Sequence, residues 1–323
     1  MAENVRRRVL VVGSLNADLT VRTRRLPAPG ETVTGSDLVV SPGGKSSNQA
    51  VAAALLGADV ALLGRVGDDA NGAFLLERAG AAGVDTSYVQ RLEAVASGTA
   101  VITVDDRGEN SIIVSPGANG RLTAADVQAA PGFFAAGSVL CLCLEVALPA
   151  VRAAAEAGAK AGIRVILNPS PFADVGADLL RVVDVLVVNR HELADLVGAD
   201  VVGEGDEPAW DRVADALAGL GPEHVLVTLG AAGAAVVSVG AGVQHDVQRV
   251  PATVVDAVDT TGSGDAFLGS LAYRLALGDD PTTACRFAVH VGAFAATRPG
   301  AQSSYPTAVE LDAFVRGRRT GTA

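Results

Sequence analysis

The sequence has few aromatic residues and fewer basic than acidic side chains, and both shortages exclude functions. Only 8 Phe, 3 Tyr and 1 Trp occur in 323 residues, and 36 acidic side chains outnumber 25 basic ones, giving a formal net charge of −11. Nucleic acids and anionic membranes are bound by basic patches, and single strands also by aromatic platforms. We therefore expect no nucleic-acid or membrane partner, and any bound phosphate must be held by backbone donors and a few cations.

Long apolar runs are also missing, which bears on membranes and on targeting. No apolar run reaches the length of about 18 residues that a membrane-spanning helix needs. The first residues, MAENVRRRVLVVGSLNAD, place only four apolar residues between a basic patch and Gly13, which favours a first strand over a signal peptide. The sequence therefore favours a cytoplasmic protein.

Cysteine and histidine are scarce, and their spacing does not indicate a metal site. Cys141 and Cys143 alternate within a strand-like run, so both side chains share one face and are expected in the core. With Cys285 the thiols are odd in number and widely spaced, which favours reduced cysteines over a disulfide framework or a metal pair. The four histidines, His191, His224, His245 and His290, lack metal-ligand spacing and are expected to be structural.

What the sequence does contain is a regular alternation of apolar and Ala-rich segments. Runs of Val, Ile and Leu predict buried parallel strands at 8–14, 60–66, 139–145, 164–170, 183–189 and 224–230. Helices are expected at 48–56, 72–82, 149–161 and 212–220, and from about residue 257 the chain is expected to be helical, at 264–277, 282–296 and 307–316. This rhythm predicts an α/β fold with three layers, α/β/α, around a mainly parallel central sheet, with residues 1–323 forming one domain.

Two segments interrupt this rhythm. Residues 19–42 and 98–119 alternate apolar with polar residues and contain turn sequences such as DDRGEN. Such segments are typical of antiparallel hairpins with one exposed face. We expect them to form a small β-sheet that sits over the main sheet as a lid.

The most informative segment is VDTTGSGDAFLGSLAYRLALG, at 258–278. Gly262, Ser263 and Gly264 precede a run with helical spacing of apolar residues, so we expect a tight turn that enters a helix. Backbone N–H groups that converge at a helix start form an anion site. Asp265 follows in the first helical turn, beside the place where the anion would lie.

An acidic residue beside an anion site is unusual for phosphate binding alone, because like charges repel. It is explained if Asp265 is a general base that takes a proton from a hydroxyl attacking phosphorus, since phosphoryl transfer needs mainly positioning and charge neutralisation. The helix start is expected to keep Asp265 ionised near neutral pH. The alternative is a carboxylate that only stabilises its own helix, and this segment alone leaves both open.

A second glycine-rich segment, SPGGKSSNQAVAAALLG at 41–57, contains GGKS but is not a Walker A motif. That motif needs a glycine five residues before its second glycine, and position 39 is Val. The segment predicts a turn into a helix with Lys45 near its start, while the first strand ends in GSLNAD. Ligands gather at the carboxyl ends of strands in such sheets, so short polar residues there suit polyol recognition, although ordinary turn chemistry is the commoner explanation. These residues are Asn16, Asp18, Gly44 and Asn48.

Together these motifs resemble one known family, the ribokinase-like carbohydrate kinases. The resemblance extends from about Val9 to Tyr305, and its segments are GSLNAD (13–18), PGETVTG (29–35), GGKSSNQAVAAA (43–54), GDD (67–69), SPGAN (115–119), NPSP (168–171), NRHE (189–192), TLGAAG (228–233) and DTTGSGDAF (259–267). It implies a homodimer that pairs through the lid sheets. No GxGxxG follows any strand, so a dinucleotide-dependent dehydrogenase has no support.

The resemblance also implies roles for individual residues. Asp265 would be the catalytic base, and Gly262, Ser263 and Gly264 would donate N–H groups to the transferred phosphoryl group. The residues implied in sugar binding are Asn16, Asp18, Gly44, Lys45, Asn48, Glu145 and Asp265. Those implied in nucleotide binding are Asn189, Thr228, Gly230, Gly233 and Gly264, with Val289 and His290 aligned beside the adenine.

Two metal ions are implied as well. Asn189 and Glu192 match an N-x-x-E pair that positions Mg²⁺ and its waters near the nucleotide phosphates, in line with the preference of this ion for oxygen ligands and retained water. K⁺ would be held by backbone and side-chain oxygens near the anion site. The matching positions are Asp259, Thr261, Ala295, Arg298, Gly300 and Ser304.

The activity implied by the resemblance is ATP-dependent phosphorylation of D-ribose at its 5-hydroxyl. The same chemistry on deoxyribose, on a nucleoside such as pseudouridine or on a ketose is an alternative, because single residues change pockets that read hydroxyl groups. A non-catalytic sugar-binding protein on this fold is a further alternative, disfavoured by the intact Asp265, glycine turn and N-x-x-E pair. One departure from the family pattern is Ser46–Ser47, where many members carry Gly-Ala.

Overall fold

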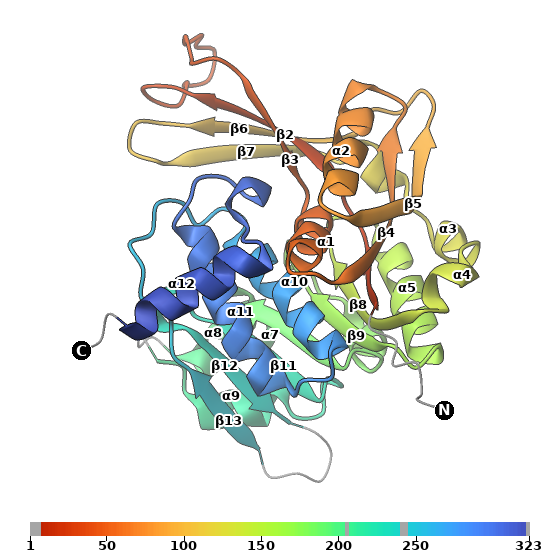
Figure 1. The fold of residues 1–323 in the computed structure, drawn as a ribbon, viewed down its shortest axis with the longest axis vertical. Helices are drawn as coiled ribbons and strands as arrows, with labels where there is room; N and C mark the ends of the chain where they lie inside the picture. Colours follow the sequence, from red (N-terminus) through yellow and green to blue (C-terminus); the bar gives the residue numbers. More distant parts are fainter. Residues whose placement is uncertain (1–7, 204–206, 240–244, 321–323) are drawn as a thin grey trace.

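A nine-stranded sheet forms the centre of the molecule (Figure 1). The computed structural model describes residues 8–203, 207–239 and 245–320. The strands in spatial order are β13 (Asp246–Val250), β12 (Ala234–Ser238), β11 (His224–Thr228), β10 (Val185–Asn189), β9 (Arg164–Asn168), β8 (Gly137–Cys143), β1 (Arg8–Val12), β4 (Asp59–Gly67) and β5 (Val84–Leu92). All neighbours from β5 to β11 are parallel, and β12 and β13 extend the sheet in antiparallel fashion.

Helices cover both faces of this sheet, so its central strands are apolar on both sides. In β1, Val9 and Val11 belong to one core cluster and Leu10 and Val12 to the other, and all four are fully buried. The first cluster is closed by α1 (Lys45–Leu55), α2 (Ala70–Ala81), α10 (Ser263–Ala276), α11 (Pro281–Ala296) and α12 (Ala308–Thr320). The second is closed by α3 (Ala124–Gln128), α4 (Pro131–Phe134), α5 (Leu148–Lys160), α6 (Gly176–Leu180), α7 (Arg190–Val197), α8 (Ala199–Val202) and α9 (Trp210–Leu217).

A second sheet of four strands projects from the main body at the top of Figure 1. Its order is β3 (Val39–Gly43), β2 (Asn16–Arg22), β6 (Gly98–Val104) and β7 (Asn110–Ser115). The pairs β2–β3 and β6–β7 are antiparallel, and a parallel β2–β6 pair joins them. Because β2 starts at Asn16, directly after the loop that follows β1, this small sheet begins at the carboxyl end of an interior strand of the main sheet.

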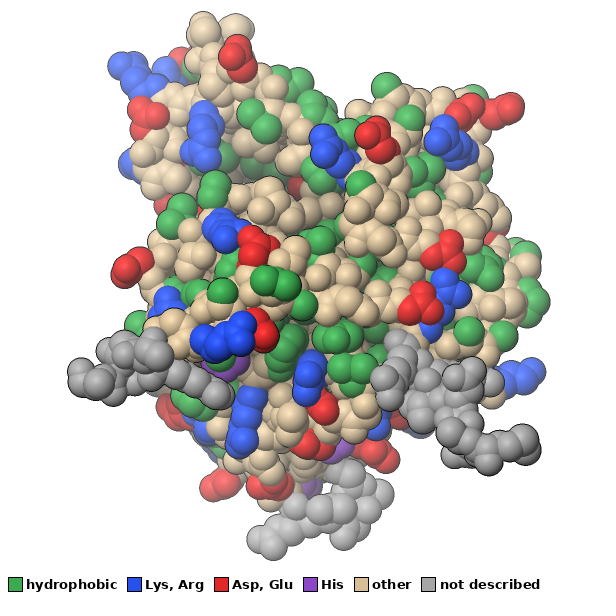
Figure 2. Space-filling view, in the orientation of Figure 1, with side chains coloured by type: hydrophobic (Ala, Val, Ile, Leu, Met, Phe, Trp, Pro, Cys, Tyr) green, Lys and Arg blue, Asp and Glu red, His purple; other side chains and the backbone are tan. Residues whose placement is uncertain are grey.

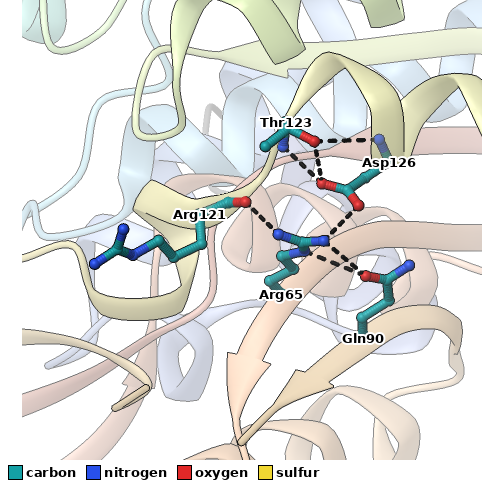
Figure 3. Close-up of polar contacts among 5 residues, drawn as sticks. All are labelled: Arg65, Gln90, Arg121, Thr123 and Asp126. Carbon is teal, nitrogen blue, oxygen red and sulfur yellow. Dashed lines mark hydrogen bonds and ion pairs between the residues drawn. The ribbon is translucent and has the colours of Figure 1, made fainter. Parts of the chain in front are cut away.

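A half-buried guanidinium connects β4, β5 and α3 near the β5 edge of the main sheet (Figure 3). Arg65 donates to the side chains of Gln90 and Asp126 and to the carbonyl of Arg121, which lies in the 3₁₀ turn η1 (Gly117–Arg121). Asp126 also closes a capping box with Thr123 at the start of α3. The cluster therefore holds the chain that returns from the small sheet against β4 and β5.

Most of the expected elements are present, and several boundaries differ. The helices expected at 48–56, 72–82, 149–161, 264–277 and 282–296 lie within three residues of the observed starts and ends. The chain is not helical from 257: residues 257–262 form an irregular turn, because the left-handed Gly262 has to precede the start of α10. The two lid hairpins exist, but 23–38 forms a long loop, and β5, β12 and β13 were not predicted.

The remaining composition-based expectations can be compared with the structure directly. Cys141 and Cys143 are buried, as predicted, and Cys285 is buried as well; all three are free thiols. On the face drawn in Figure 2, acidic and basic side chains are interspersed over the surface. None of the helices in the described part of the chain is both long enough and apolar enough to cross a bilayer.

Candidate active site

The site lies at the carboxyl ends of β1 and β8, where the strand order reverses. From β1 the chain proceeds to β4 and β5 on one side, and from β8 to β9, β10 and β11 on the other. Loops that follow the two strands at such a switch point diverge and leave a crevice for a ligand. Ser14 after β1 and Glu145 after β8 meet there, with 2.6 Å between the Ser14 Oγ and a Glu145 carboxylate oxygen.

Glu145 joins three segments of the site. The carboxylate oxygen that accepts from Ser14 also accepts from the backbone N–H of Lys45 at 2.9 Å, at the start of α1. Gly44, the residue before α1, has φ 88°, and a Cβ there would lie 2.8 Å from the backbone nitrogen of Asn16. Glu145 was expected to contact sugar hydroxyls, and the structure gives one of its oxygens the task of fixing the two glycine-containing loops.

Asn16 and Asp18, at the start of β2, face the same space from the small sheet. The Asn119 side chain, from η1, donates to Asn16 Oδ1 at 2.7 Å. It also donates to the carbonyl of Leu15 and accepts from the N–H of Leu15. Asp18 lies against Gly43, where a Cβ would be only 2.1 Å from the Asp18 carboxylate. Burial, followed by the charges of Glu145 and Asp265, raises the pKa of Asp18 to about 7. A hydrogen bond from a donor such as a sugar hydroxyl would stabilise the ionised form of this carboxyl group.

Asp265 is the third residue of α10, and its carboxylate turns toward α1. Asn48 Nδ2 donates to one oxygen at 2.9 Å and Gln49 Nε2 to the other at 3.4 Å. Burial raises the pKa of Asp265, while the charge of Lys45 and the two amides act in the opposite direction. The helix start is expected to keep this group ionised near neutral pH. In the structure burial shifts its pKa upward, and the main opposing charge is that of Lys45.

Lys45 is the cation of the site. Burial works against its charge, but Asp265 and Glu145 more than compensate and raise the pKa of Lys45. The ammonium therefore stays protonated at neutral pH, near enough to both carboxylates to be influenced by their charges. A cation there is available to an anionic ligand as well as to Asp265.

The glycine turn before α10 has the geometry of an anion site, with one correction. Gly262 has φ 71°, and a Cβ there would lie 2.6 Å from the Tyr305 hydroxyl. The N–H of Ser263, expected to face a phosphoryl group, instead donates to the carbonyl of Thr260 at 3.1 Å, because it closes the turn. A Cβ on Gly264 would meet no atom within 4 Å, so the space beside this residue is open for a ligand.

A pocket of about 150 Å³ extends from this turn across the ends of β9, β10 and β11. Its wall contains seven of the predicted residues, which are Lys45, Asn189, Glu192, Thr228, Gly262, Gly264 and Asp265. Asn168 and Ser170, after β9, complete its polar lining and were not predicted as site residues. The pocket thus joins the proposed base to the residues expected to hold a nucleotide.

Asn189 and Glu192 form a reciprocal capping box at the start of α7. Asn189 Oδ1 accepts from the N–H of Glu192 at 2.9 Å, and a Glu192 oxygen accepts from the N–H of Asn189 at 2.8 Å. Asn168 adds a donor to the same Glu192 oxygen at 3.4 Å. The other oxygen of this buried carboxylate is available to a ligand in the pocket. Asn189 and Glu192 thus cap α7 and also line the pocket.

The expected nucleotide and adenine positions lie on the β11 side. Thr228 ends β11, and η2 (Gly230–Ala232) turns the chain back with φ 58° at Gly230. Gly233 has φ 92°, and a Cβ there would be 2.2 Å from the carbonyl of Val250. Val289 on α11 is buried, and His290 pairs with the Thr253 hydroxyl at 2.6 Å.

Asp259 connects two of the other positions expected for K⁺. Its two carboxylate oxygens accept from the N–H groups of Thr261 and Gly300, at 2.9 and 2.8 Å. Ser304, in η3 (Gln302–Ser304), is fully buried and donates to the carbonyl of Ala301. The Arg298 guanidinium points to Glu310 and to the ring of Phe294, so only its carbonyl could face this site. Ala295 accepts from the N–H of Arg298 in the same turn.

Comparison with known proteins identifies the family of the chain. The family description "pfkB family carbohydrate kinase" matches residues 6–308. A ribokinase of Haemophilus influenzae is 34% identical over 311 residues, which cover 96% of this chain and 99% of the relative. A deoxyribokinase of Salmonella typhi is 35% identical over 311 residues, covering 95% and 98%.

The solved structures give the same result. The structure of Arabidopsis thaliana ribokinase complexed with ribose and ATP is similar with a TM-score of 0.84 at 30% identity, covering 95% of this chain and 98% of that one. Ribokinase from Thermotoga maritima is similar with a TM-score of 0.84 at 31% identity, covering 95% and 99%. The chain therefore belongs to the pfkB family of carbohydrate kinases.

Proposed function

We propose that this chain is an ATP-dependent kinase that phosphorylates D-ribose on its 5-hydroxyl. The observation that carries the proposal is the position of Asp265, whose carboxylate lies at the junction of two spaces. On one side are the polar residues of β2 and α1, and on the other is the pocket at the ends of β9 to β11. Relatives named ribokinase support ribose as the sugar.

The residues assign the chemical step as follows. The proton of the sugar hydroxyl moves to a carboxylate oxygen of Asp265 while the hydroxyl oxygen forms a bond to the γ-phosphorus. The bond from that phosphorus to the bridging oxygen breaks, and ADP leaves with its electron pair. Lys45 and the open backbone beside Gly264 face the charge on the transferred group, and the raised pKa of Asp265 suits a base that has to take up a proton.

The residues present fit a magnesium ion delivered with the nucleotide. No group of three or more His, Cys, Asp or Glu side chains that could hold a metal occurs in the described ranges, and Glu192 brings a single buried carboxylate to the pocket. Mg²⁺ bound through one carboxylate, water and phosphates needs no larger cluster, and it would neutralise phosphate charge during transfer. Glu192 would orient its waters, with Asn189 beside it.

The loop around Asp259 fits a potassium ion. Its oxygen donors are hard and uncharged apart from one carboxylate, and they lie behind the glycine turn, where Asp259 already connects Thr261 to Gly300. A monovalent cation held there would stabilise the connection between these two loops. The positions involved are Asp259, Thr261, Ala295, Arg298, Gly300 and Ser304.

We also infer a homodimer in the cytoplasm. Seven apolar side chains of the small sheet and its approach are at least 43% exposed, and exposed apolar side chains that gather in one region are typical of protein–protein interfaces. They are Leu38, Val39, Val40, Val101, Ile112, Ile113 and Val114. Free cysteines suit a reducing compartment.

One alternative substrate is favoured by a specific observation. A deoxyribokinase is as similar to this chain as the ribokinases are, at 35% identity. The two sugars differ by the 2-hydroxyl alone, and a site built to bond that hydroxyl rejects the sugar that lacks it strongly. The ratio of kcat/KM for ribose and 2-deoxyribose therefore assigns the substrate.

The experiment that tests the proposal is ADP release with Mg²⁺ and ATP on a panel of ribose, 2-deoxyribose, pseudouridine and fructose, each with KCl or with NaCl. Highest kcat/KM on ribose, increased by K⁺, is the expected result. Highest turnover on another compound would move the substrate assignment and keep Asp265 as base. Absence of turnover on the whole panel, together with sugar binding by calorimetry, would overturn the kinase and leave a sugar-binding protein.

A further inference from the structure

A glutamine far along the chain is bonded directly to the residues beside the proposed base. Gln302, at the start of η3, reaches the first turn of α1, where its Nε2 donates to Ser47 Oγ at 3.1 Å and to Asn48 Oδ1 at 3.0 Å. Both hydrogens of this amide nitrogen are therefore used. Asn48 in turn donates from Nδ2 to Asp265.

The direction of these hydrogen bonds is set by the carboxylate. An ionised carboxylate can only accept, so Asn48 has to present its NH₂ group to Asp265 and its carbonyl oxygen to the other side. That carbonyl oxygen lies in a nearly closed space, since Asn48 is only 6% exposed, and it needs a donor. Gln302 is the donor that it finds.

Without that donor, the orientation of Asn48 is no longer fixed at both ends. Rotation of its amide by half a turn places the carbonyl oxygen against Asp265, which is repulsive for the ionised acid and attractive for the protonated acid. Gln49, the second donor to Asp265, is longer at 3.4 Å, and its own carbonyl oxygen has no hydrogen-bond partner within the described ranges. Gln49 is therefore a weak substitute.

We propose that Gln302 is a positioning residue for the phosphoryl-transfer reaction: by holding Asn48 in one amide orientation, it keeps a donor on Asp265 and favours the ionised base. The inference rests on the proposed function, in which Asp265 takes the proton of the hydroxyl. Gln302 itself touches neither Asp265 nor the pocket in the described contacts. Its effect passes through Asn48.

Other groups act on Asp265 from the surrounding elements and stay unchanged when Gln302 is replaced. Lys45 on α1 favours its charge, while Glu145 after β8 and Asp18 on β2 oppose it. Tyr305 follows η3 and donates to the carbonyl of Gly262. Its phenol stays neutral, since burial, followed by the charges of Asp265 and Asp18, raises its pKa well above the usual value. A shift in the titration of Asp265 in a variant that replaces Gln302 without adding charge is therefore attributable to the Asn48 contact.

Two replacements distinguish the effect that Gln302 exerts on Asp265 through Asn48, here called the relay, from simple packing. Gln302→Leu removes the donor without adding charge, whereas Gln302→Glu keeps the size and can still bond the Ser47 hydroxyl but turns the donor into an acceptor. A Glu at this position draws the NH₂ group of Asn48 toward itself and its carbonyl toward Asp265. The relay thus makes Gln302→Glu the more damaging change, and a packing role makes it the milder one. Ser47→Ala removes only the other acceptor and is the matched control.

The test measures kcat, KM for sugar and ATP, and the pH dependence of kcat/KM for the wild type and these three variants. We expect kcat to fall roughly tenfold in Gln302→Leu and further in Gln302→Glu, with KM for ATP within about twofold. The acidic limb should move to higher pH in the same order, and Ser47→Ala should remain within about twofold of the wild type. Equal losses in Gln302→Leu and Ser47→Ala, or a milder Gln302→Glu, would overturn the relay.

A second measurement keeps this result independent of the substrate assignment. Carboxyl ¹³C titration of protein labelled at Asp, with the Asp265 signal assigned from Asp265→Asn, follows the base in the free protein. The relay predicts a higher midpoint in Gln302→Leu, a still higher one in Gln302→Glu and no change in Ser47→Ala. Identical midpoints in all of them overturn the relay, whereas an inactive wild type with the predicted midpoints overturns the proposed kinase function alone.

Discussion

Asp265 and Glu192 occupy the same position in their helices, and they use it differently. Each is the third residue of its helix, α10 and α7, and each carboxylate lies in the same pocket. Glu192 reaches back to the N–H of Asn189 and caps its own helix. Asp265 follows a glycine, and the hydrogen bonds it accepts among the described residues come from Asn48 and Gln49 on α1.

The difference separates a carboxylate that stabilises the fold from one that burdens it. Capping at this position is worth roughly 1 kcal/mol, and Glu192 forms both hydrogen bonds of its capping box. Asp265 is instead desolvated beside another helix, which raises its pKa. A group that the fold holds at a cost, next to an open pocket, is a candidate for chemistry, whereas position in a helix alone is not.

The largest expected effect is that of Asp265→Asn, which tests whether the carboxylate of Asp265 acts as the base. Loss of the base should lower kcat by about 10³-fold or more, because the hydroxyl proton has no acceptor. Stability should remain the same or increase, since a buried charge is removed. Steady-state kinetics and thermal unfolding measure both, with calorimetry of sugar binding as the control. A kcat within tenfold of the wild type would contradict the assignment of the base.

The glycine turn provides the next prediction, because a side chain would fit at Gly264 but would clash with its neighbours at Gly262. Gly264→Ala places a methyl group in open space, so the fold should be kept and helix α10 slightly stabilised, by about 0.5 kcal/mol. The same methyl group enters the space of the transferred phosphoryl, and kcat should fall at least tenfold by our estimate. Gly262→Ala instead forces a left-handed φ and a contact with Tyr305, which should cost roughly 1–3 kcal/mol.

Measured together, the two variants distinguish a ligand site from a purely structural turn. Loss of activity without loss of melting temperature in Gly264→Ala is the result that the ligand site predicts. Full activity in this variant would mean that no group of the substrate approaches Gly264. Loss of stability in both variants would mean that the turn is constrained by the protein alone.

How much of this could be predicted from the sequence depends on the range of the interactions. Strands covered on both faces, such as 8–14 and 224–230, are visible as unbroken apolar runs. The segment VDTSYVQRL at 84–92 is not, because an edge strand tolerates polar residues, and the AAVVS strand at 234–238 is too short to be distinctive. The two lid hairpins were recognised by their alternation.

Within the site, the motifs predicted which residues line the pocket but not how they are bonded. Asn48 was expected to contact a sugar, and its partners Asp265 and Gln302 lie 217 and 254 residues away in the chain. Asn119 likewise holds Asn16 from 103 residues away. Such pairings follow from how the elements pack, and local pattern carries no signal for them.

Two substitutions of Glu192 test the other carboxylate of the comparison, and they separate its capping role from its proposed role toward Mg²⁺. Glu192→Gln retains a capping oxygen, so stability should stay within about 0.5 kcal/mol, whereas Glu192→Ala loses the cap and should cost about 1 kcal/mol. Both remove the charge, and the Mg²⁺ concentration for half-maximal rate should rise roughly tenfold in each. Chemical denaturation and Mg²⁺ titration of the rate measure these effects. An unchanged Mg²⁺ requirement would leave Glu192 with the cap alone.

The smallest expected effect concerns Asp18, the half-buried carboxylate of the site that no donor satisfies among the described contacts. Its pKa is raised from 3.8 to about 7 in the folded protein, so the folded state holds a proton that the unfolded state has lost. This group therefore favours folding at low pH and loses that contribution as the pH rises from about 4 to 7. Asp18→Asn removes the penalty and should stabilise the ligand-free protein by roughly 1–2 kcal/mol at pH 8, after allowance for solvent screening.

The pH dependence decides whether this gain has the stated cause. The stabilisation by Asp18→Asn, measured by denaturant unfolding, should be smaller at pH 5 than at pH 8, because the wild-type carboxyl is largely protonated in the folded protein at pH 5. Sugar affinity should fall in the same variant, since the carboxylate that a hydroxyl would satisfy is gone. An equal gain at both values of pH would trace the effect to packing. In that case Asp18 would not carry an unsatisfied charge in the folded protein, and its raised pKa would no longer be an argument for sugar binding at the start of β2.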